Sequence, residues 1–329
     1  MSLSRPSVRI SVNGRSLSAA EAALLSLRLD IGVFGAHDAA LLTLWPQSTL
    51  ADSQPGDTLS IALGEQGAEQ DQLTGQISTV RRSLRSVTLE GLGATAVLSR
   101  TFVAQTFLNQ SIGQIVRDLA GSGGVSIDQV QADLTLGAWH ADSSRPVWSH
   151  LQQLARLSGS DLGTSAAGGL RFVPADAAST PTQLRYGAEL LDWELAQTEA
   201  QEPPQVAALG AGSEAGSEKS HWLRHDPGAG SRSRIQAGLV TKDAADAAAK
   251  ALKDAASRAA LRGRVWIVGN AGLRPGDTVE LADLPGQSPG TLRVLALQHR
   301  LDTQSGFVTR LSVEGAGGGG GAGGLGGLP

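Results

Sequence analysis

The fold of this chain is decided by a stretch that occurs twice, PGDTLSIAL at residues 55–63 and PGDTVELADL at residues 275–284. Proline presets its own φ and glycine accepts a positive φ, so Pro-Gly fits the two central positions of a type II turn. The aliphatic residues that follow alternate with period two, which predicts a strand directly after each turn. Both copies therefore read as a tight turn that leads into a strand.

The sequence after each turn continues with the same kinds of elements in the same order. The first copy goes on as LTGQISTVRRSLRSVTLEG at 73–91 and the second as TLRVLALQHRLDTQSGFVTRLSVEG at 291–315. Each reads as a hairpin that closes on aliphatic-x-aliphatic-Glu-Gly. Similarity over four residues arises easily by chance, whereas a turn, an alternating strand and a closing hairpin in one order indicate a duplicated β-domain.

The bulk composition limits the class of protein. A chain of 329 residues is long enough for two or three domains. It contains no cysteine, which removes disulfides, thiolate zinc sites and cysteine nucleophiles and suits a reducing cytoplasm. The net charge of −4 gives no global attraction to nucleic acid or to an anionic membrane. No run is apolar enough for a transmembrane helix or a signal peptide, so we expect no membrane insertion and no export by that route.

The predicted fold class is α+β but mainly β, with two antiparallel β-barrels and an inserted small α+β module. Alternating residues on both sides of the hairpin dipeptide Asn13-Gly14 predict the first barrel, over 1–99. The module is expected at 100–182, where the apolar periodicity changes from two to that of a helix.

Two helices are expected within this module. The first follows Ser111 as N-cap, and the second begins at Pro146 and ends at Gly159. Their apolar positions fall at helical spacing, since Ile112 and Leu119 lie seven residues apart on one face. Alternation at 170–172 then predicts a return to strand.

The second barrel is predicted over 183–314. It includes a Gly/Ser-rich loop at 210–234 that we expect to be mobile, and an Ala-rich helix at 241–262 that Gly263 closes. The last stretch, 315–329, is so rich in glycine that it predicts a flexible coil with a reach of roughly 20 Å.

This order of elements is similar to the baseplate hub of bacteriophage tails, the late-control gene D family, and it resembles the hub portion of VgrG, the spike protein of type VI secretion. The matching stretches lie at 100–119, 148–159, 240–261 and 273–313, while the first barrel matches only in its general pattern. The resemblance implies a homotrimer in which each subunit contributes two tube-type barrels. Three subunits then form a pseudo-hexameric ring around a central channel.

The resemblance also implies the partners and the place of the protein. The ring would adapt a hexameric tail tube, or a distal tube protein, to a trimeric central spike, with baseplate wedge and tape-measure proteins as further partners and DNA only in transit. The location would be the virion tail baseplate, or an injection-system particle, assembled in the bacterial cytoplasm. Some hubs continue into an OB-type barrel and a β-helical needle, whereas this sequence stops in its Gly-rich tail. We therefore expect the spike to be a separate polypeptide, or to be bound through that tail.

Residues that could carry chemistry do not form a recognised site. His221 and His225 are four residues apart, but they lie in a Gly/Ser-rich loop with no third ligand at an obvious spacing. The run GAGSRSR at 228–234 lacks the Lys and Ser/Thr pair of a phosphate-binding loop. We predict no metal and no cofactor.

Another candidate is a Ser-His-Asp arrangement. His140 and His150 flank Asp142 and Ser143, but no strand-nucleophile-helix elbow surrounds any serine. We predict no catalytic residue and no enzyme activity.

The remaining candidates are a basic cluster and the tryptophans. Arg81, Arg82 and Arg85 fall at a hairpin tip without interleaved aromatic residues, which favours a solvated tip over a nucleic-acid contact. Core or interface anchors are the expected role of five tryptophans: Trp45, Trp139, Trp148, Trp193 and Trp266.

Two other classes of function stay open. One is a cell-wall-binding or peptidoglycan-degrading tail-tip protein, which peptidoglycan zymography would reveal. The other is a β-barrel that binds single-stranded nucleic acid, which would give a salt-dependent gel shift and which the acidic balance of the chain disfavours.

Overall fold

The structure, a computed structural model, describes residues 5–33, 35, 37–176, 179–199, 205–212, 221–224, 233–236, 238–239, 242–285 and 289–317. Of these, 205–212, 221–224, 233–236 and 242–243 are described by their backbone alone. Most of the Gly-rich tail predicted at 315–329 lies outside the described residues.

The first half of the molecule is an antiparallel sheet. Its strands are β1 (Pro6–Val12), β2 (Arg15–Ser18), β3 (Leu24–Gly32), β4 (Ala39–Leu44), β5 (Thr58–Glu65), β6 (Ala68–Arg82) and β7 (Val87–Gly93). They pair in the order β3-β4-β7-β6-β5-β1-β2. Asn13 and Gly14, which join β1 to β2, both have positive φ, at 50° and 80°. The expected Asn-Gly hairpin is therefore present, and the alternating aliphatic residues enclose one core.

The second half repeats this plan. Its strands are β13 (Thr182–Arg185), β14 (Leu190–Gln197), β18 (Leu261–Val268), β19 (Thr278–Ala282), β20 (Thr291–Asp302) and β21 (Gly306–Gly315). They pair in the order β14-β18-β21-β20, and β19 pairs with β20 on one edge and with β13 on the other. A second core lies on one face of these strands.

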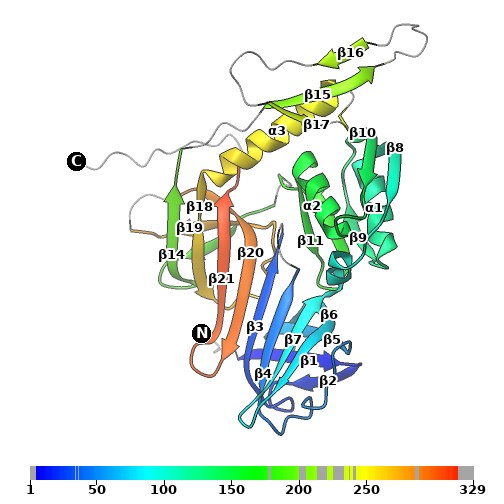
Figure 1. Cartoon of the computed structure of the whole chain (residues 1–329). Helices are drawn as coiled ribbons and strands as arrows, with labels where there is room; N and C mark the ends of the chain where they lie inside the picture. The colour runs from blue at the N-terminus through cyan, green and yellow to red at the C-terminus, as the bar shows by residue number, and fades with distance from the viewer. Residues whose placement is uncertain are drawn as a thin grey trace.

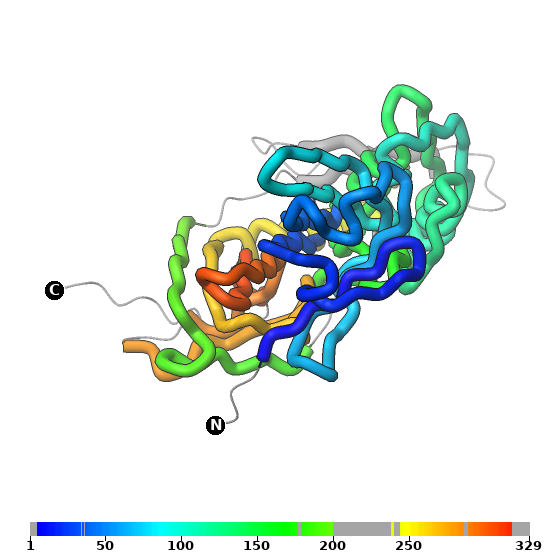
Figure 2. Tube along the Cα trace, turned by 90° about the horizontal axis from the view of Figure 1, so that it is seen from below, coloured from blue at the N-terminus to red at the C-terminus, as the bar shows by residue number. Residues whose placement is uncertain are grey.

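The two halves are parts of one 13-stranded sheet, because β20 pairs with β3. Residues 296–302 lie antiparallel to residues 26–32, and Figures 1 and 2 show the two halves side by side. The sequence predicted two barrels but not this junction between them.

Both Pro-Gly-Asp turns have the same geometry. Gly56 and Gly276 adopt φ of 98° and 97°, which a β-carbon would strain. Each turn exchanges two backbone hydrogen bonds with the second strand after it, β6 or β20. In the first half, Gly56 N donates to Ile77 O at 2.8 Å and Ile77 N donates to Asp57 O at 2.9 Å. In the second half, Gly276 N donates to Val294 O and Val294 N donates to Asp277 O, both at 2.8 Å. The turns are therefore equivalent in their hydrogen bonds as well as in sequence.

Two β-bulges also occur at matching places in the two halves. They lie between Leu24 and Ser26 and between Ile77 and Thr79 in the first half, and between Leu190 and Asp192 and between Val294 and Ala296 in the second. Alignment on these bulges makes β3 equivalent to β14, β4 to β18, β5 to β19, β6 to β20 and β7 to β21. Bulges interrupt pairing at specific positions, so their agreement establishes the repeat residue by residue.

One detail of the sequence alignment is wrong. Ile77 pairs with Gly91, whereas its equivalent Val294 pairs with Val313. The Glu-Gly pair that closes the first hairpin is therefore offset by two residues from Glu314-Gly315, and Leu92 is the equivalent of Glu314. A shift of two leaves every side chain on the same face of a strand, so the alternation could not reveal it.

The inserted module has its own core. It consists of the 3₁₀ helix η1 (Ala94–Ser99), β8 (Gln105–Ser111), α1 (Ile112–Ser122), β9 (Ile127–Val130), β10 (Thr135–Ala141), α2 (Val147–Ser158), β11 (Ser160–Thr164) and β12 (Leu170–Pro174). Ser111 caps α1 through a capping box with Gln114, and Gly159 ends α2 at a φ of 65°. Both helix predictions are confirmed. None of the helices in the described ranges is long and apolar enough to cross a membrane.

The Ala-rich helix differs from its prediction. It is α3 (Lys242–Ala259), and β18 begins at Leu261, so the helix ends three residues before 262. Gly263 lies inside β18, where a β-carbon would come within 1.9 Å of the Glu194 carbonyl oxygen. Its role is therefore close strand packing and not helix capping. Ala244 and Ala248 of α3 are buried in the core of the inserted module.

The segment predicted as a mobile loop at 210–234 contains regular structure. β15 (Gln205–Gly212) pairs antiparallel with β16 (His221–Arg224) and parallel with β17 (Ser233–Gln236). Figure 1 shows these strands beside α3. The prediction of a loop is wrong for residues 210–212, 221–224 and 233–234, which lie in these strands. Residues 213–220 and 225–232 lie outside the described part of the chain.

Candidate assembly interface

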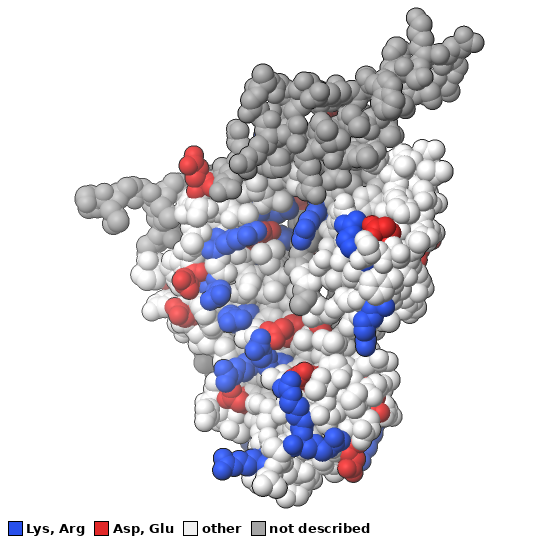
Figure 3. All heavy atoms as spheres, in the orientation of Figure 1, with Lys and Arg blue, Asp and Glu red and all other residues white. Residues whose placement is uncertain are grey.

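The β3–β20 junction shows how two edges of this sheet pair. Val33 N donates to Leu295 O at 3.0 Å, so residues 33 and 295 are a hydrogen-bonded pair. Along the ladder from this pair, non-hydrogen-bonded and hydrogen-bonded pairs alternate. On the uncovered face, Gln298 Nε2 donates to Asp30 Oδ1 at 2.6 Å. Figure 3 shows charged side chains spread over this face, where they form ion pairs such as Arg28–Asp30 at 2.7 Å.

His299 and Asp38 lie buried near this junction. Burial lowers the pKa of His299 to about 4, with a smaller contribution from the positive charge of Arg274. Burial raises the pKa of Asp38 to about 7, although the carboxylate accepts a hydrogen bond from Gly32 N at 3.1 Å and lies near Arg274. Both shifts favour the neutral form, as burial in a low dielectric requires.

A buried charge cluster ties the inserted module to the second half. Arg293 Nη1 donates to Glu314 Oε1 at 3.1 Å and Arg258 Nε donates to the same oxygen at 3.2 Å. Arg293 also donates to Asp161 of β11. All four side chains are at most 7% exposed, so each charge depends on the others for compensation.

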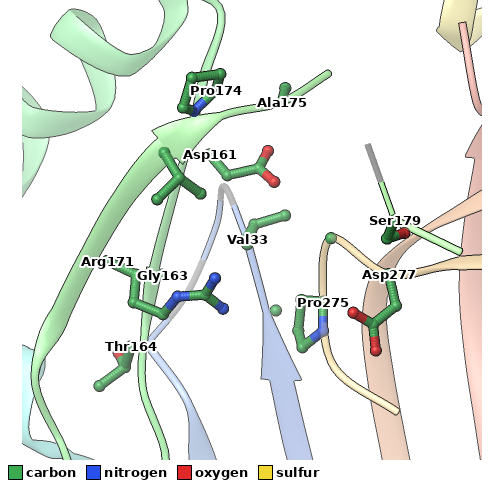
Figure 4. A pocket seen from close by; sticks show the side chains of 13 residues that line it. Val33, Asp161, Gly163, Thr164, Arg171, Pro174, Ala175, Ser179, Pro275 and Asp277 are labelled. Carbon is green, nitrogen blue, oxygen red and sulfur yellow. The ribbon is translucent and has the colours of Figure 1, made fainter. Parts of the chain in front are cut away.

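The insert covers the second Pro-Gly-Asp turn. A cavity of about 160 Å³ lies between Val33 at the end of β3, Arg171 and Asp161 of the insert, and Pro275 and Asp277 of the turn. Figure 4 shows the strands of the insert standing against this turn.

The first Pro-Gly-Asp turn is not covered in this way. Pro55 and Gly56 line a larger hollow of about 570 Å³. Its other walls are formed by Gln76 and Leu92 of the first half, by Arg100, and by residues 123–126 and 167–168 of the insert. Gln76 and Leu92 are the equivalents of Arg293 and Glu314. The first half therefore has an open hollow where the second half has a buried charge cluster.

The outer end of β6 has a free edge. Residues 79–82 pair with β7 on one side, and none of the described strands pairs with the other side. Their equivalents, residues 296–299 of β20, are covered by β3. Beyond this end the hairpin tip is exposed, and Leu84 is 100% exposed.

The second free edge belongs to β14. This strand pairs with β18, and on its other side the described residues show only an isolated bridge between Tyr186 and Leu190. Leu191 and Trp193 are 51% and 37% exposed, although both are large and apolar. Thr198 N donates to Ala260 O at 2.8 Å, so the amide of Thr198 points toward β18. Successive amides of a strand point to opposite edges, so the amides of the neighbouring odd-numbered residues face the free edge.

The two free edges carry opposite charges. The end of β6 and its tip hold Arg81, Arg82 and Arg85, whereas β14 and the residues after it hold Asp192, Glu194 and Glu199. Arg81 pairs with Glu90 at 2.7 Å and Arg82 donates to the carbonyl oxygens of Ala51 and Ser53. Arg85 forms no ion pair with a described residue. The tip is exposed, as the sequence predicted.

The histidines of the insert do not form a catalytic triad. His150 is fully buried, and its Nε2 donates to the backbone oxygen of Asp142 at 3.0 Å. The Asp142 carboxylate instead accepts from Ser144 and Arg145, and the hydrogen bonds from Ser144 hold its pKa below the usual range. His140 is hydrogen-bonded to Thr106 at 3.0 Å.

The structure places the other candidates as follows. No group of three potential metal ligands occurs among the residues that the structure describes. His221 lies in β16, and His225 lies outside the described residues, as does most of the run at 228–234. Trp139 and Trp148 are buried core residues, while Trp45 and Trp193 are exposed. The sequence did not single out β14 as an edge, although three acidic residues close together were a signal.

The sequence matches no protein-family model and no curated protein. Solved structures are similar to it in fold. The tail protein from Neisseria meningitidis MC58 has a TM-score of 0.71 at 15% identity, over 94% of this chain and 96% of that chain. The 43 kDa tail protein of prophage MuSo2 from Shewanella oneidensis has a TM-score of 0.67 at 12% identity, over 94% and 98%.

A third similar structure is the E. coli c3393 protein, described as a component of the type VI secretion system with structural similarity to the T4 bacteriophage tail proteins gp27 and gp5. It has a TM-score of 0.59 at 10% identity, over 92% of this chain and 76% of that chain. These similarities show that the chain has the fold of phage-tail proteins. The predicted class, α+β and mainly β, is confirmed.

Proposed function

We propose that this chain is a structural, non-catalytic hub of a phage tail or of a related contractile injection particle. Three copies would form a ring with six similar sheets, which adapts a hexameric tail tube to a trimeric central spike around a channel for DNA. The particle would be assembled in the bacterial cytoplasm. The division at 1–99, 100–182 and 183–314 stays a prediction that belongs to this proposal.

The repeat with its matching bulges is the observation that supports the proposal. A duplicated unit lets three chains present six near-equivalent surfaces, as docking onto a hexamer requires. The fold of the similar tail proteins supports the same role. No described contact of His140 or His150 favours the alternative of a peptidoglycan-degrading protein.

The test is the mass of the purified chain by light scattering. A trimer would have about 101 kDa, three times the 33.7 kDa of the chain. Electron microscopy of the same sample should show a ring of threefold outline with six similar lobes. A chain that stays monomeric at every concentration, also with tube and spike proteins added, would exclude the proposal.

A further inference from the structure

We infer that β14 of one copy adds to the free edge of β6 in the next copy, in the register that joins β3 to β20 within the chain. The inference rests on the proposed trimer and names the surfaces that build it. Its occupant is a second copy of this chain, because the same sequence supplies both edges and already pairs their equivalents internally.

The register follows from the bulge alignment. Within the chain, 296 pairs with 32, 297 with 31, 298 with 30 and 299 with 29. The equivalents place Thr79 opposite Thr198 of the next copy, Val80 opposite Gln197, Arg81 opposite Ala196 and Arg82 opposite Leu195. By the alternation that starts at 33 and 295, Arg81 and Ala196 form a non-hydrogen-bonded pair, with closely spaced side chains.

The backbone of β14 has amides that point to its free edge. Thr198 N is already used on the β18 side. The amides of Leu195 and Gln197 therefore face outward, as the amides of Leu29 and Ile31 face β20. An unpaired strand edge is a template for pairing with another chain unless something covers it.

The side chains agree with the same partner. Continuation of the register brings the hairpin tip of β6 near Trp193 and Asp192 of the next copy. Leu84 at the tip is fully exposed, and Trp193 is 37% exposed. Contact between them would remove both from water, and Arg85 would meet the carboxylate of Asp192. Opposite charges on the two edges steer association and disfavour pairing of two identical edges.

The hollow at the first turn supplies an independent observation. Within the chain, Gly32 and Val33 at the end of β3 line the cavity at the second turn. Their equivalents, Thr198 and Glu199 of the next copy, would enter the hollow of about 570 Å³ at the first turn, which Arg100 lines. A neighbouring chain would thus fill the space left between the first turn and residues 123–126 and 167–168 of the insert.

The contact is heterologous, because β6 of one copy meets β14 of the next. Contacts of this kind close into a ring or extend as a filament. In a ring, each copy contributes the eight strands that run from β14 to β6 in the order of the sheet. Three copies therefore make one barrel of 24 strands. The uncovered, charged face of the sheet then lines one side of that barrel throughout.

Cysteine cross-linking tests the register, because the chain contains no cysteine of its own. The variant carries Arg81→Cys with Ala196→Cys and is oxidised at a concentration where light scattering has measured its mass. We expect a covalent trimer on a non-reducing gel, with a dimer at partial oxidation. Each single variant should give no cross-link alone, while a mixture of the two should give a dimer only.

Two double variants serve as controls. Gln298→Cys with Asp30→Cys makes the equivalent pair within the chain and should close without a change in mass. Arg81→Cys with Gln197→Cys shifts the register by one residue onto the opposite face and should not cross-link.

A trimer by light scattering without the 81–196 cross-link would overturn this interface and leave the proposed trimer standing. A monomer without any cross-link would overturn both. A cross-link in single variants, which signals a symmetric contact, would overturn the heterologous pairing. Pairing of the β6 edge with tube protein in place of a second copy would also overturn it.

Discussion

β3 and β14 occupy equivalent places in the two halves, yet their surroundings differ. β3 pairs on both edges and buries Leu27, Leu29 and Ile31, whereas β14 pairs on one edge and leaves Leu191 and Trp193 exposed. The same ladder and the same bulge thus exist in a completed and an incomplete form. The difference teaches that the chain completes one junction internally, while the equivalent edges have no partner strand among the described residues.

The outer ends of the two halves differ in a second way. The second half is fixed to the insert by Arg293, Glu314 and Asp161, while the equivalent positions Gln76 and Leu92 line an open hollow. We expect the buried charge cluster to serve stability and the free edge of β14 to serve assembly.

The largest effect is expected for Arg293→Ala. This change removes the arginine partner of buried Asp161 and one of the two buried arginines that donate to Glu314. It should lower the free energy of unfolding by about 3–5 kcal/mol. Chemical denaturation measures it. The control is Gln76→Ala at the equivalent exposed position, where a change within about 0.5 kcal/mol is expected. Equal losses at both positions would contradict the distinction between the two halves.

The next effect is expected for Gln197→Pro, which removes an amide at the free edge of β14. The lost hydrogen bond should weaken each contact between copies by about 2 kcal/mol, roughly 30-fold in Kd. The oligomer should dissociate while the melting temperature of the monomer changes little. Ala196→Pro is the control, because its amide faces β18 and its loss should lower the melting temperature. An intact trimer of Gln197→Pro would argue against β14 as the docking edge.

A smaller, pH-dependent effect is expected for Asp38→Asn at the completed junction. The folded protein holds a proton on Asp38 up to about pH 7, whereas a free aspartate loses it near 3.8, so this group makes stability fall as the pH rises between these values. Asparagine keeps an acceptor for Gly32 and removes the charge. The variant should gain about 1–2 kcal/mol over the parent at pH 8 and little at pH 4. The same gain at both pH values would refute a charge effect.

His37 and His299 act in the opposite direction. Burial lowers the pKa of both to about 4, so the folded state binds fewer protons than the unfolded state between pH 4 and the ordinary 6.5. Their contribution to stability is present above this window and is lost as the pH falls through it. The gain of Asp38→Asn must therefore be compared with the parent at each pH.

The smallest effect is expected for Arg85→Glu, which places like charges at the contact of the β6 tip with β14. Association should weaken by about 0.5–1 kcal/mol, more at low salt than at high salt. Asp192→Arg in the same chain should restore it. Arg15→Glu, on β2, should have no effect on association. If the double variant does not restore association, Arg85 and Asp192 do not meet across the interface. Sedimentation at two salt concentrations measures all four proteins.

Local signals were read correctly from the sequence. Ser111 caps α1 and Gly159 ends α2, because a cap depends on residues within one turn of the chain. The end of α3 was missed, since Gly263 resembles a helix stop but is required by the close approach of β14. The two-residue offset between the closing hairpins was missed because alternation repeats every two residues.

The sequence by itself determined the turns, the strand alternation, the two short helices and the existence of a repeat, since each depends on neighbours in the chain. Only the tertiary structure decided that β3 pairs with β20, that Arg293 meets Asp161, and that β6 and β14 keep free edges. These pairings join residues more than 100 positions apart, and any edge of a sheet can accept any other until packing and charge select one.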